Sequence, residues 1–230
     1  MPCVGVGGYP MKYFEFFSND QARNNWLVNT ELKEPPWVVT KPRYASCFCL
    51  KCELPYLDAL FEEGFDDSVK IRARGDLFES SDGFVCVNEK VKGLVESDGF
   101  RGVAFKPVGK AGWWVVNATC RVSGDEQAYT RRNTCPGCGR ARQTYGQICC
   151  VSQIDCPKEA GTFFSPTFAR SGYSDRDLFV TEDIVTSFKK HGVKGGMFSR
   201  LLDATEFEAV KAANALMDPL RWPKDSKVVL

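Results

Sequence analysis

The clearest chemical character of this sequence lies in the stretch Cys135-Pro136-Gly137-Cys138-Gly139. Two thiolates separated by two residues can lie about 3.5 to 4 Å apart on a tight turn, which suits two corners of a zinc tetrahedron. The glycines allow backbone amides to turn toward the sulfur atoms. One such turn, which we call a knuckle, supplies only half of a four-coordinate site.

The other half of the site is available upstream, in Cys49-Leu50-Lys51-Cys52. We therefore predict a structural zinc site whose four ligands are Cys49, Cys52, Cys135 and Cys138. Cys47 offers a competing ligand beside the first pair. The alternative is a set of reduced, buried cysteines that bind no metal, since a free cysteine often packs as a small hydrophobic residue.

The composition is that of an ordinary globular protein, with 43% hydrophobic and 26% charged residues in a chain of 230. The net charge is +1, so no long-range field attracts nucleic acid or a membrane surface. No window approaches the roughly 18 apolar residues of a membrane span. Because the cysteines number eleven and no secretory signal opens the chain, we expect a reducing cytoplasm, where CxxC pairs indicate metal or redox sites.

The elements around these cysteines contain an internal repeat. Its two copies are offset by 93 residues, so that Asn88 in the first copy corresponds to Thr181 in the second. The first copy covers residues 84–105 and the second covers residues 177–198. Each predicts a short strand, an N-cap, a helix with an acidic first turn and, after a glycine, a second strand. The side chains expected to be buried on the two helices are Val91 and Val95, and Ile184 and Phe188. We interpret the repeat as a duplication, the alternative being chance similarity of two amphipathic helices.

These patterns predict an α+β fold with mixed sheets, a duplicated strand–helix–strand unit and a pair of zinc knuckles that together supply four cysteines. Residues 1–10 are expected to be a flexible extension, and residues 11–110 an N-terminal half with the first CxxC and the first copy. Residues 111–230 are expected to form a C-terminal half with the second knuckle, the second copy and a terminal helix.

Several smaller features complete the prediction along the chain. Residues 112–118 indicate a central strand, whereas residues 163–166 and 172–175 resemble loops. A capping box beginning at Thr205 should open the terminal helix. The remaining clustered cysteines fit a strand with buried thiols better than further ligands; they are Cys149, Cys150 and Cys156.

Catalysis has little support in the sequence. The single histidine, His191, follows two lysines at the predicted end of the second helix, where a cation is favoured by the helix dipole. A Cys–His pair stays open, because such partners meet in space rather than in sequence. Thiol redox chemistry is another alternative, but it would need Cys135 and Cys138 to open a helix after a strand.

A nucleic-acid-binding or regulatory zinc ribbon is the main alternative to a protein-binding function. It rests on four arginines around the second knuckle and on an aromatic residue nearby that could stack on bases: Arg131, Arg132, Arg140, Arg142 and Tyr145. Four arginines are equally typical of a solvated loop, and the near-neutral net charge supplies no supporting field. We therefore expect nucleic acid to be an improbable partner.

The chain resembles the bacterial double-CXXCG motif proteins and the related immunity proteins of polymorphic toxin systems. The resemblance covers most of the chain after Met11 and rests on four stretches: Met11 to Phe16, the pair Cys49 and Cys52, the knuckle Cys135 to Gly139, and Asp175 to Phe198. The first pair departs from the motif, because Glu53 stands where the motif has glycine.

This resemblance implies a cytoplasmic, non-enzymatic zinc protein that neutralises a cognate toxin by direct binding. No catalytic residues carry over from the family. If the toxin is a basic nuclease, the residues expected to steer it are the acidic group Glu62, Glu63, Asp66 and Asp67. The alternative for this acidic group is an ordinary solvated face.

Overall fold

The structure, a computed structural model, describes residues 11–18, 26–31, 38–109, 112–125, 129–146, 148–166 and 178–215. Two of the predicted features lie outside these residues, namely the extension at residues 1–10 and the loop at residues 172–175.

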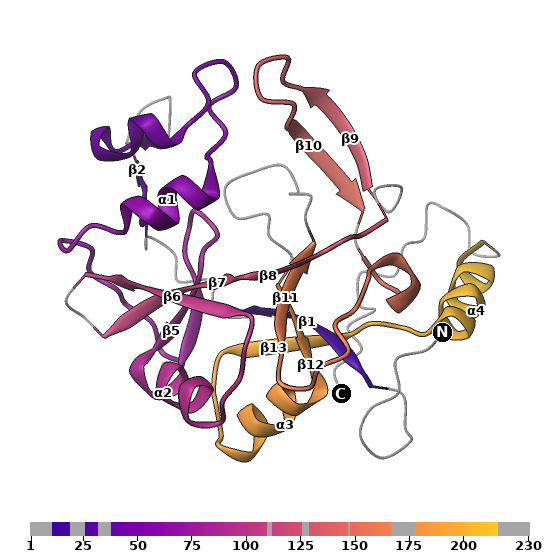
Figure 1. The fold of residues 1–230 in the computed structure, drawn as a ribbon. Helices are drawn as coiled ribbons and strands as arrows, with labels where there is room; N and C mark the ends of the chain where they lie inside the picture. Colours follow the sequence, from indigo (N-terminus) through magenta and orange to yellow (C-terminus); the bar gives the residue numbers. More distant parts are fainter. Residues whose placement is uncertain are drawn as a thin grey trace.

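Two β-sheets form the centre of the molecule (Figure 1). The first has the strand order β4 (Leu77–Glu79), β5 (Val85–Asn88), β7 (Trp113–Ala118) and β6 (Val103–Val108). The second has the order β13 (Gly196–Arg200), β1 (Tyr13–Ser18), β12 (Leu178–Thr181), β11 (Phe163–Pro166) and β8 (Cys120–Val122). All neighbouring strands are antiparallel except β11 and β8.

Two small ribbons and several short helices surround the sheets. The ribbons are β2 (Asn29–Glu31) with β3 (Val38–Thr40), and β9 (Tyr129–Thr134) with β10 (Ala141–Gly146). The α-helices are α1 (Leu57–Glu63), α2 (Glu89–Ser97), α3 (Glu182–Lys190) and α4 (Ala204–Ala215), and the 3-10 helices are η1 (Pro42–Cys47) and η3 (Val151–Gln153). The predicted α+β class is thus confirmed.

The predicted strand–helix–strand order of both copies is also confirmed. The order is β5–α2–β6 in the first copy and β12–α3–β13 in the second, and each of these elements begins at the same offset of 93 residues. The four side chains expected in the core are buried, and they are Val91, Val95, Ile184 and Phe188. Asn88 caps α2 by accepting a hydrogen bond from the amide of Val91 at 3.1 Å. Thr181 occupies the equivalent position, but its hydroxyl accepts from the amide of Thr162 instead of capping α3.

Each copy encloses a strand that comes from outside it. In the first sheet β7 lies between β5 and β6, and in the second sheet β1 lies between β12 and β13. The inserted strand follows the first copy in the chain, whereas it precedes the second. Each sheet therefore draws strands from both sides of residue 110, and both sheets need the N-terminal and C-terminal parts of the chain.

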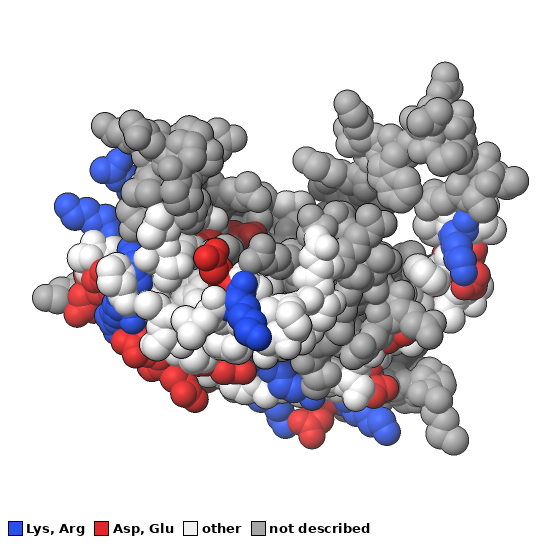
Figure 2. Space-filling view, turned by 90° about the horizontal axis from the view of Figure 1, so that it is seen from above, with Lys and Arg blue, Asp and Glu red and all other residues white. Residues whose placement is uncertain are grey.

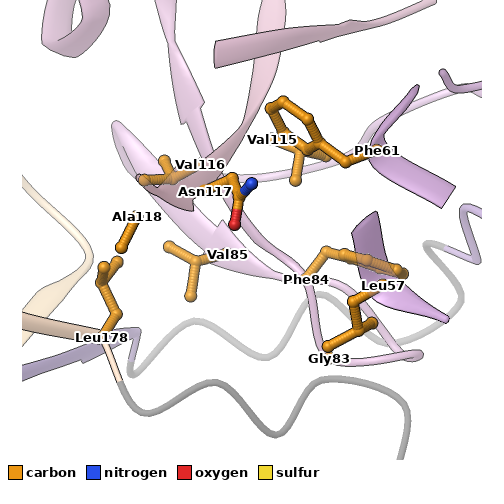
Figure 3. A pocket seen from close by; sticks show the side chains of 10 residues that line it. All are labelled: Leu57, Phe61, Gly83, Phe84, Val85, Val115, Val116, Asn117, Ala118 and Leu178. Atoms are coloured by element: carbon orange, nitrogen blue, oxygen red, sulfur yellow. The ribbon is translucent and has the colours of Figure 1, made fainter. Parts of the chain in front are cut away.

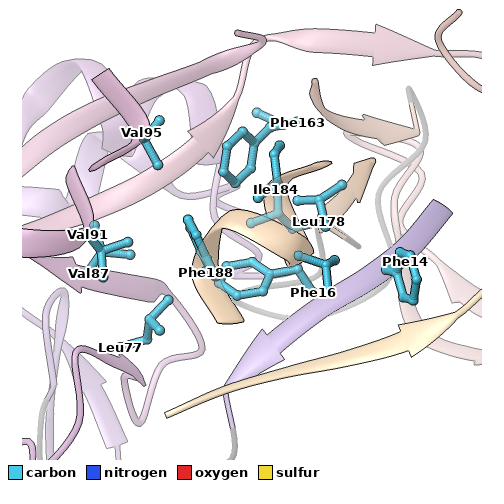
Figure 4. Packing of buried hydrophobic residues seen from close by; sticks show 13 residues of the cluster. Phe14, Phe16, Leu77, Val87, Val91, Val95, Phe163, Leu178, Ile184 and Phe188 are labelled. Atoms are coloured by element: carbon cyan, nitrogen blue, oxygen red, sulfur yellow. The ribbon is translucent and has the colours of Figure 1, made fainter. Parts of the chain in front are cut away.

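The largest hydrophobic cluster joins the two copies (Figure 4). It includes Leu77 and Val87 from the first sheet, Phe14 and Phe16 from β1, and Phe188 from α3. The ring of Phe16 stacks on that of Phe198 in β13 with a centroid distance of 5.2 Å. Aromatic and branched side chains from distant segments thus form one core.

Two local expectations were wrong. Residues 163–166 were expected as a loop but form β11, in which all four residues are buried. A strand buried on both faces shows no alternation of polar and apolar residues, so its short sequence resembles an apolar loop. The terminal helix is capped by Asp203 rather than Thr205, since Asp203 and Glu206 exchange hydrogen bonds between side chains and amides at 2.8 and 3.0 Å.

Candidate metal centre

The first knuckle lies in the turn between η1 and α1. The residues on either side of it are joined by an isolated antiparallel β-bridge between Phe48 and Pro55. The amide of Cys49 donates to the carbonyl of Leu54 at 3.0 Å, and the amide of Glu53 donates to the carbonyl of Cys49 at 2.8 Å. These two bonds fold residues 49–54 into one compact turn.

The second knuckle forms the turn of the β9–β10 ribbon. The amide of Cys135 donates to the carbonyl of Arg140 at 2.8 Å, and the amide of Gly139 donates to the carbonyl of Cys135 at 2.8 Å. The amide of Gly137 donates to the sulfur of Cys135 at 3.3 Å. The two knuckles therefore share one backbone hydrogen-bond pattern, although their sequences differ.

Glu53 reproduces the backbone conformation of the motif glycine. Its φ is 58°, and the φ of Gly139, the corresponding residue of the second knuckle, is 72°. Both residues thus occupy the left-handed region, which glycine adopts without steric cost and other residues adopt rarely. The departure at Glu53 leaves the geometry of the first knuckle intact.

The four predicted ligands come together. The sulfur atoms of Cys49, Cys52, Cys135 and Cys138 all lie within 4.8 Å of one another. The Cys49–Cys135 sulfur distance is 4.0 Å and the Cys52–Cys138 distance is 3.5 Å. Figure 1 shows the two turns meeting at the top of the molecule, on the side away from α2 and α3.

This arrangement fits a metal with tetrahedral preference. A zinc–sulfur bond of about 2.3 Å implies sulfur atoms about 3.8 Å apart, which lies between the two distances above. Three of the cysteines are buried, Cys138 is half-buried, and Leu54 packs against the group. The site therefore has soft ligands and an apolar surround, both of which suit zinc.

Backbone donors favour ionisation of two of the thiols. Hydrogen bonds from the amides of Lys51 and Cys52 lower the pKa of Cys49 to about 6. A hydrogen bond from the amide of Arg140 lowers the pKa of Cys138. Burial raises the pKa of Cys52 to about 12. Since metals bind thiolates, these backbone donors favour the form of the cysteines that binds a metal.

The other cysteines that the structure describes lie outside this group. Cys47 is buried at the end of η1 in a separate apolar cluster, so the structure uses Cys49 and not Cys47 as the fourth neighbour. Cys150 is fully buried, and its sulfur lies 3.0 Å from the hydroxyl of Ser152. The predicted strand around Cys149, Cys150 and Cys156 is instead the 3-10 helix η3 with isolated bridges on either side.

The acidic residues expected to face a partner lie in the last turn of α1 and in the segment that follows it, and two of them have partners within the chain. Glu63 pairs with Arg43 at 3.1 Å. The carboxylate of Asp66 accepts from the amide of Ser68 at 2.8 Å, and this bond lowers the pKa of Asp66. Glu62 and Asp67 are exposed. A role for these residues in partner binding stays a prediction.

Two observations bear on the redox and nucleic-acid alternatives, although the side chains of Arg131, Arg132, Arg142 and Tyr145 lie outside what the structure describes. Cys135 and Cys138 lie in a β-turn and not at the start of a helix, which a thioredoxin-like pair requires. The guanidinium of Arg140 binds main-chain carbonyls, so it is not free to bind phosphate. On the face shown in Figure 2, acidic and basic side chains are interspersed among the described residues, without an extended area of one sign.

His191 also has a structural role. It follows the last residue of α3, and its Nδ1 atom lies 2.9 Å from the carbonyl of Ser187. The hydroxyl of Ser187 donates to Asp98 at 2.5 Å, which joins α3 to the end of α2. The hydroxyl of Ser187 also lies 3.4 Å from Nδ1 of His191, so the imidazole takes part in this contact between the two helices.

A small apolar cavity of about 50 Å³ lies between α1 and the first sheet (Figure 3). Asn117 is the polar side chain in its wall, and it accepts a hydrogen bond from Arg121 at 3.2 Å. The remaining lining residues are Leu57, Phe61, Gly83, Phe84, Val85, Val115, Val116, Ala118 and Leu178. None of these residues is titratable, so the cavity offers no acid, base or nucleophile.

No family model matches this chain, and no curated protein is similar to it in sequence. The resemblance to double-CXXCG proteins therefore stays an expectation. In the described part of the chain, no helix combines the length and the apolar character that crossing a bilayer requires.

Proposed function

We propose that the four cysteines hold one structural zinc ion and that the chain is a non-enzymatic binding protein. The observation that carries this proposal is the convergence of four sulfur atoms within 4.8 Å from two knuckles of the same backbone geometry. When bound, zinc supplies a cross-link between the η1–α1 segment and the β9–β10 ribbon. Four thiolates leave no coordination position for a substrate, which is the arrangement of structural and not of catalytic zinc.

The metal content of purified protein tests this proposal directly. Protein prepared without chelator is expected to contain about one zinc per chain, and a Cys135→Ser/Cys138→Ser variant none. The variant should also melt at a lower temperature, because metal-binding energy contributes to folding energy. The matched control is Cys47→Ala, which removes a buried thiol near the site and should retain the metal. Freshly reduced parent protein without metal would contradict the proposal.

The partner that we propose is a cognate protein toxin, which the chain neutralises in the cytoplasm by occluding it. Two points support this proposal: the sequence resemblance, and the four cysteine ligands, which leave no coordination position on the metal for a substrate. The two strand–helix–strand copies, derived by duplication, would serve as a rigid scaffold for the binding surface. Such a scaffold keeps the ordering cost of association low.

Neutralisation can be tested wherever a neighbouring reading frame encodes a protein with a toxin domain at its C-terminal end. Co-expression of this chain is expected to restore growth of cells that produce the toxin, and the two proteins should co-purify as a complex. The control is a toxin domain from an unrelated system, against which the chain should give no protection. Failure to protect against the neighbouring toxin would contradict the immunity function without affecting the zinc site.

A further inference from the structure

Arg140 connects the two knuckles without using a sulfur atom. It is the second residue after Cys138, and its guanidinium reaches the main chain that follows the first knuckle. One terminal nitrogen donates to the carbonyl of Pro55, and the other donates to the carbonyl of Leu54 at 2.7 Å. A planar guanidinium can satisfy two adjacent acceptors at once, which an ammonium group does poorly.

Tyr56 extends this connection to a ligand. The guanidinium carbon of Arg140 lies 4.5 Å from the centre of the Tyr56 ring, a cation–π distance. The side chain of Tyr56 also interacts with Cys49, one of the four proposed ligands. The main chain of Arg140 completes the set, because its carbonyl accepts from the amide of Cys135 and its amide donates to Cys138.

The positive charge of Arg140 also favours bringing the four ligands together. Four thiolates within 4.8 Å repel one another, and a tetrathiolate zinc centre keeps a net negative charge. A guanidinium held beside the ligands offsets part of this repulsion. Loss of a group that holds and orients metal ligands from outside the coordination sphere typically lowers metal affinity by about 10- to 100-fold.

We infer that Arg140, acting with Tyr56, is a positioning residue that assembles the two knuckles before the metal binds and thereby sets the affinity of the centre. This inference rests on the proposed zinc site. In the metal-free protein, Arg140 holds residues 54–56 against the second knuckle, so the metal meets four ligands that are already gathered. Its removal weakens metal binding but leaves the four ligands and the stoichiometry unchanged.

The test compares Arg140→Met, Arg140→Lys and Tyr56→Phe with the parent protein. Zinc affinity is measured by competition with a chromogenic chelator, and the ligand geometry is followed by the absorption spectrum of the Co2+-loaded protein. Arg140→Met is expected to bind zinc about 10- to 100-fold more weakly than the parent, still with one site per chain. The zinc affinity of Arg140→Lys should lie between those of Arg140→Met and the parent. Tyr56→Phe should also bind zinc more weakly than the parent. The control is Arg43→Met, which removes another arginine stacked on a tyrosine, at 5.5 Å from the Tyr44 ring, but away from the four sulfur atoms.

Melting temperatures of the metal-free proteins separate positioning from a merely structural role. A positioning role changes the increase in melting temperature that zinc produces, whereas a structural role lowers the metal-free and metal-bound values equally. Unchanged zinc affinity in Arg140→Met, or in Arg140→Lys if the Met variant does not fold, would overturn the inference and leave the zinc site standing. A parent protein that binds neither zinc nor Co2+ would instead overturn the proposed site itself.

Discussion

Glu53 shows how a knuckle can keep its shape without the usual glycine. Its amide makes the same bond to the first cysteine carbonyl that Gly139 makes in the second knuckle, at 2.8 Å in both cases. The backbone hydrogen bonds therefore hold Glu53 at a φ of 58° against its steric preference. The strain of a side chain in this region is on the order of 1 kcal/mol, which the turn accommodates.

Replacing Glu53 by glycine is expected to stabilise the protein. The substitution removes the steric strain but increases the freedom of the unfolded chain, so the net gain in free energy of unfolding should be about 0.5 kcal/mol. Chemical denaturation of the zinc-loaded protein measures it. The matched control is Gly139→Ala, which faces no atom within 4 Å and should lose stability through its φ of 72° alone. A loss of stability in Glu53→Gly would show that the side chain stabilises this turn.

Each strand–helix–strand copy docks on a strand that pairs with the other copy, and the two contacts are equivalent. The amide of Leu77 in β4 donates to the carbonyl of Lys194 at 3.2 Å, and the amide of Phe163 in β11 donates to the carbonyl of Arg101 at 2.9 Å. Arg101 and Lys194 correspond through the offset of 93 residues. Each is followed by a glycine with positive φ, Gly102 or Gly195, where an added Cβ would collide with a carbonyl of the strand that pairs with the opposite copy. Close approach of the two main chains is therefore the reason that both glycines are needed.

Gly195→Ala should destabilise the protein through this contact. The new methyl group would meet the carbonyl of Leu77, a main-chain atom in a buried strand that cannot move away cheaply. We expect a loss of about 1–3 kcal/mol in the free energy of unfolding. Gly93→Ala is the control, because Gly93 lies in α2 with no atom within 4 Å of a new Cβ, and alanine there should stabilise the helix by about 1 kcal/mol. Equal effects of the two substitutions would contradict this account of the docking contact.

Asp76 links the two halves of the molecule by charge as well as by packing. Its carboxylate accepts from the side chain of Asn88 at 2.9 Å, the ammonium of Lys90 at 3.0 Å and the amide of Lys194 at 2.9 Å. Burial by itself opposes ionisation of this group. The hydrogen bonds from Lys194, Lys90 and Asn88 outweigh it, so that the pKa of Asp76 is lowered.

This lowered pKa predicts a contribution to acid sensitivity. A carboxyl group whose pKa is lower in the folded than in the unfolded chain stabilises the fold above the unfolded value, near 3.9, and this stabilisation is lost as the pH falls through the folded pKa. Asp76→Asn should therefore be less stable than the parent at pH 7, and the difference should shrink below about pH 4. Denaturant unfolding of both metal-free proteins at pH 7 and pH 3 measures it. A difference that is independent of pH would assign the effect to lost packing.

Local sequence was sufficient for the features that depend on short-range geometry. The spacing of Cys49 with Cys52 and of Cys135 with Cys138 predicted two turns whose sulfur atoms now lie together. The repeat predicted both copies, because caps, glycine stops and apolar positions three or four residues apart are properties of single helices. Residues 163–166 were missed because a doubly buried strand has no local signature.

Long-range contacts determined the rest. The pairing of β1 with β12 and β13, the burial of Asp82 beneath the amides of residues 27–29, and the reach of Arg140 to Leu54 join segments far apart in the chain. Arg140 looked like a surface arginine for nucleic acid, since nothing in its local sequence indicated the carbonyls that it binds. Such hydrogen-bond partners are determined by how sheets and turns pack. Packing decides which polar groups are buried away from water, and buried polar groups must form hydrogen bonds with one another.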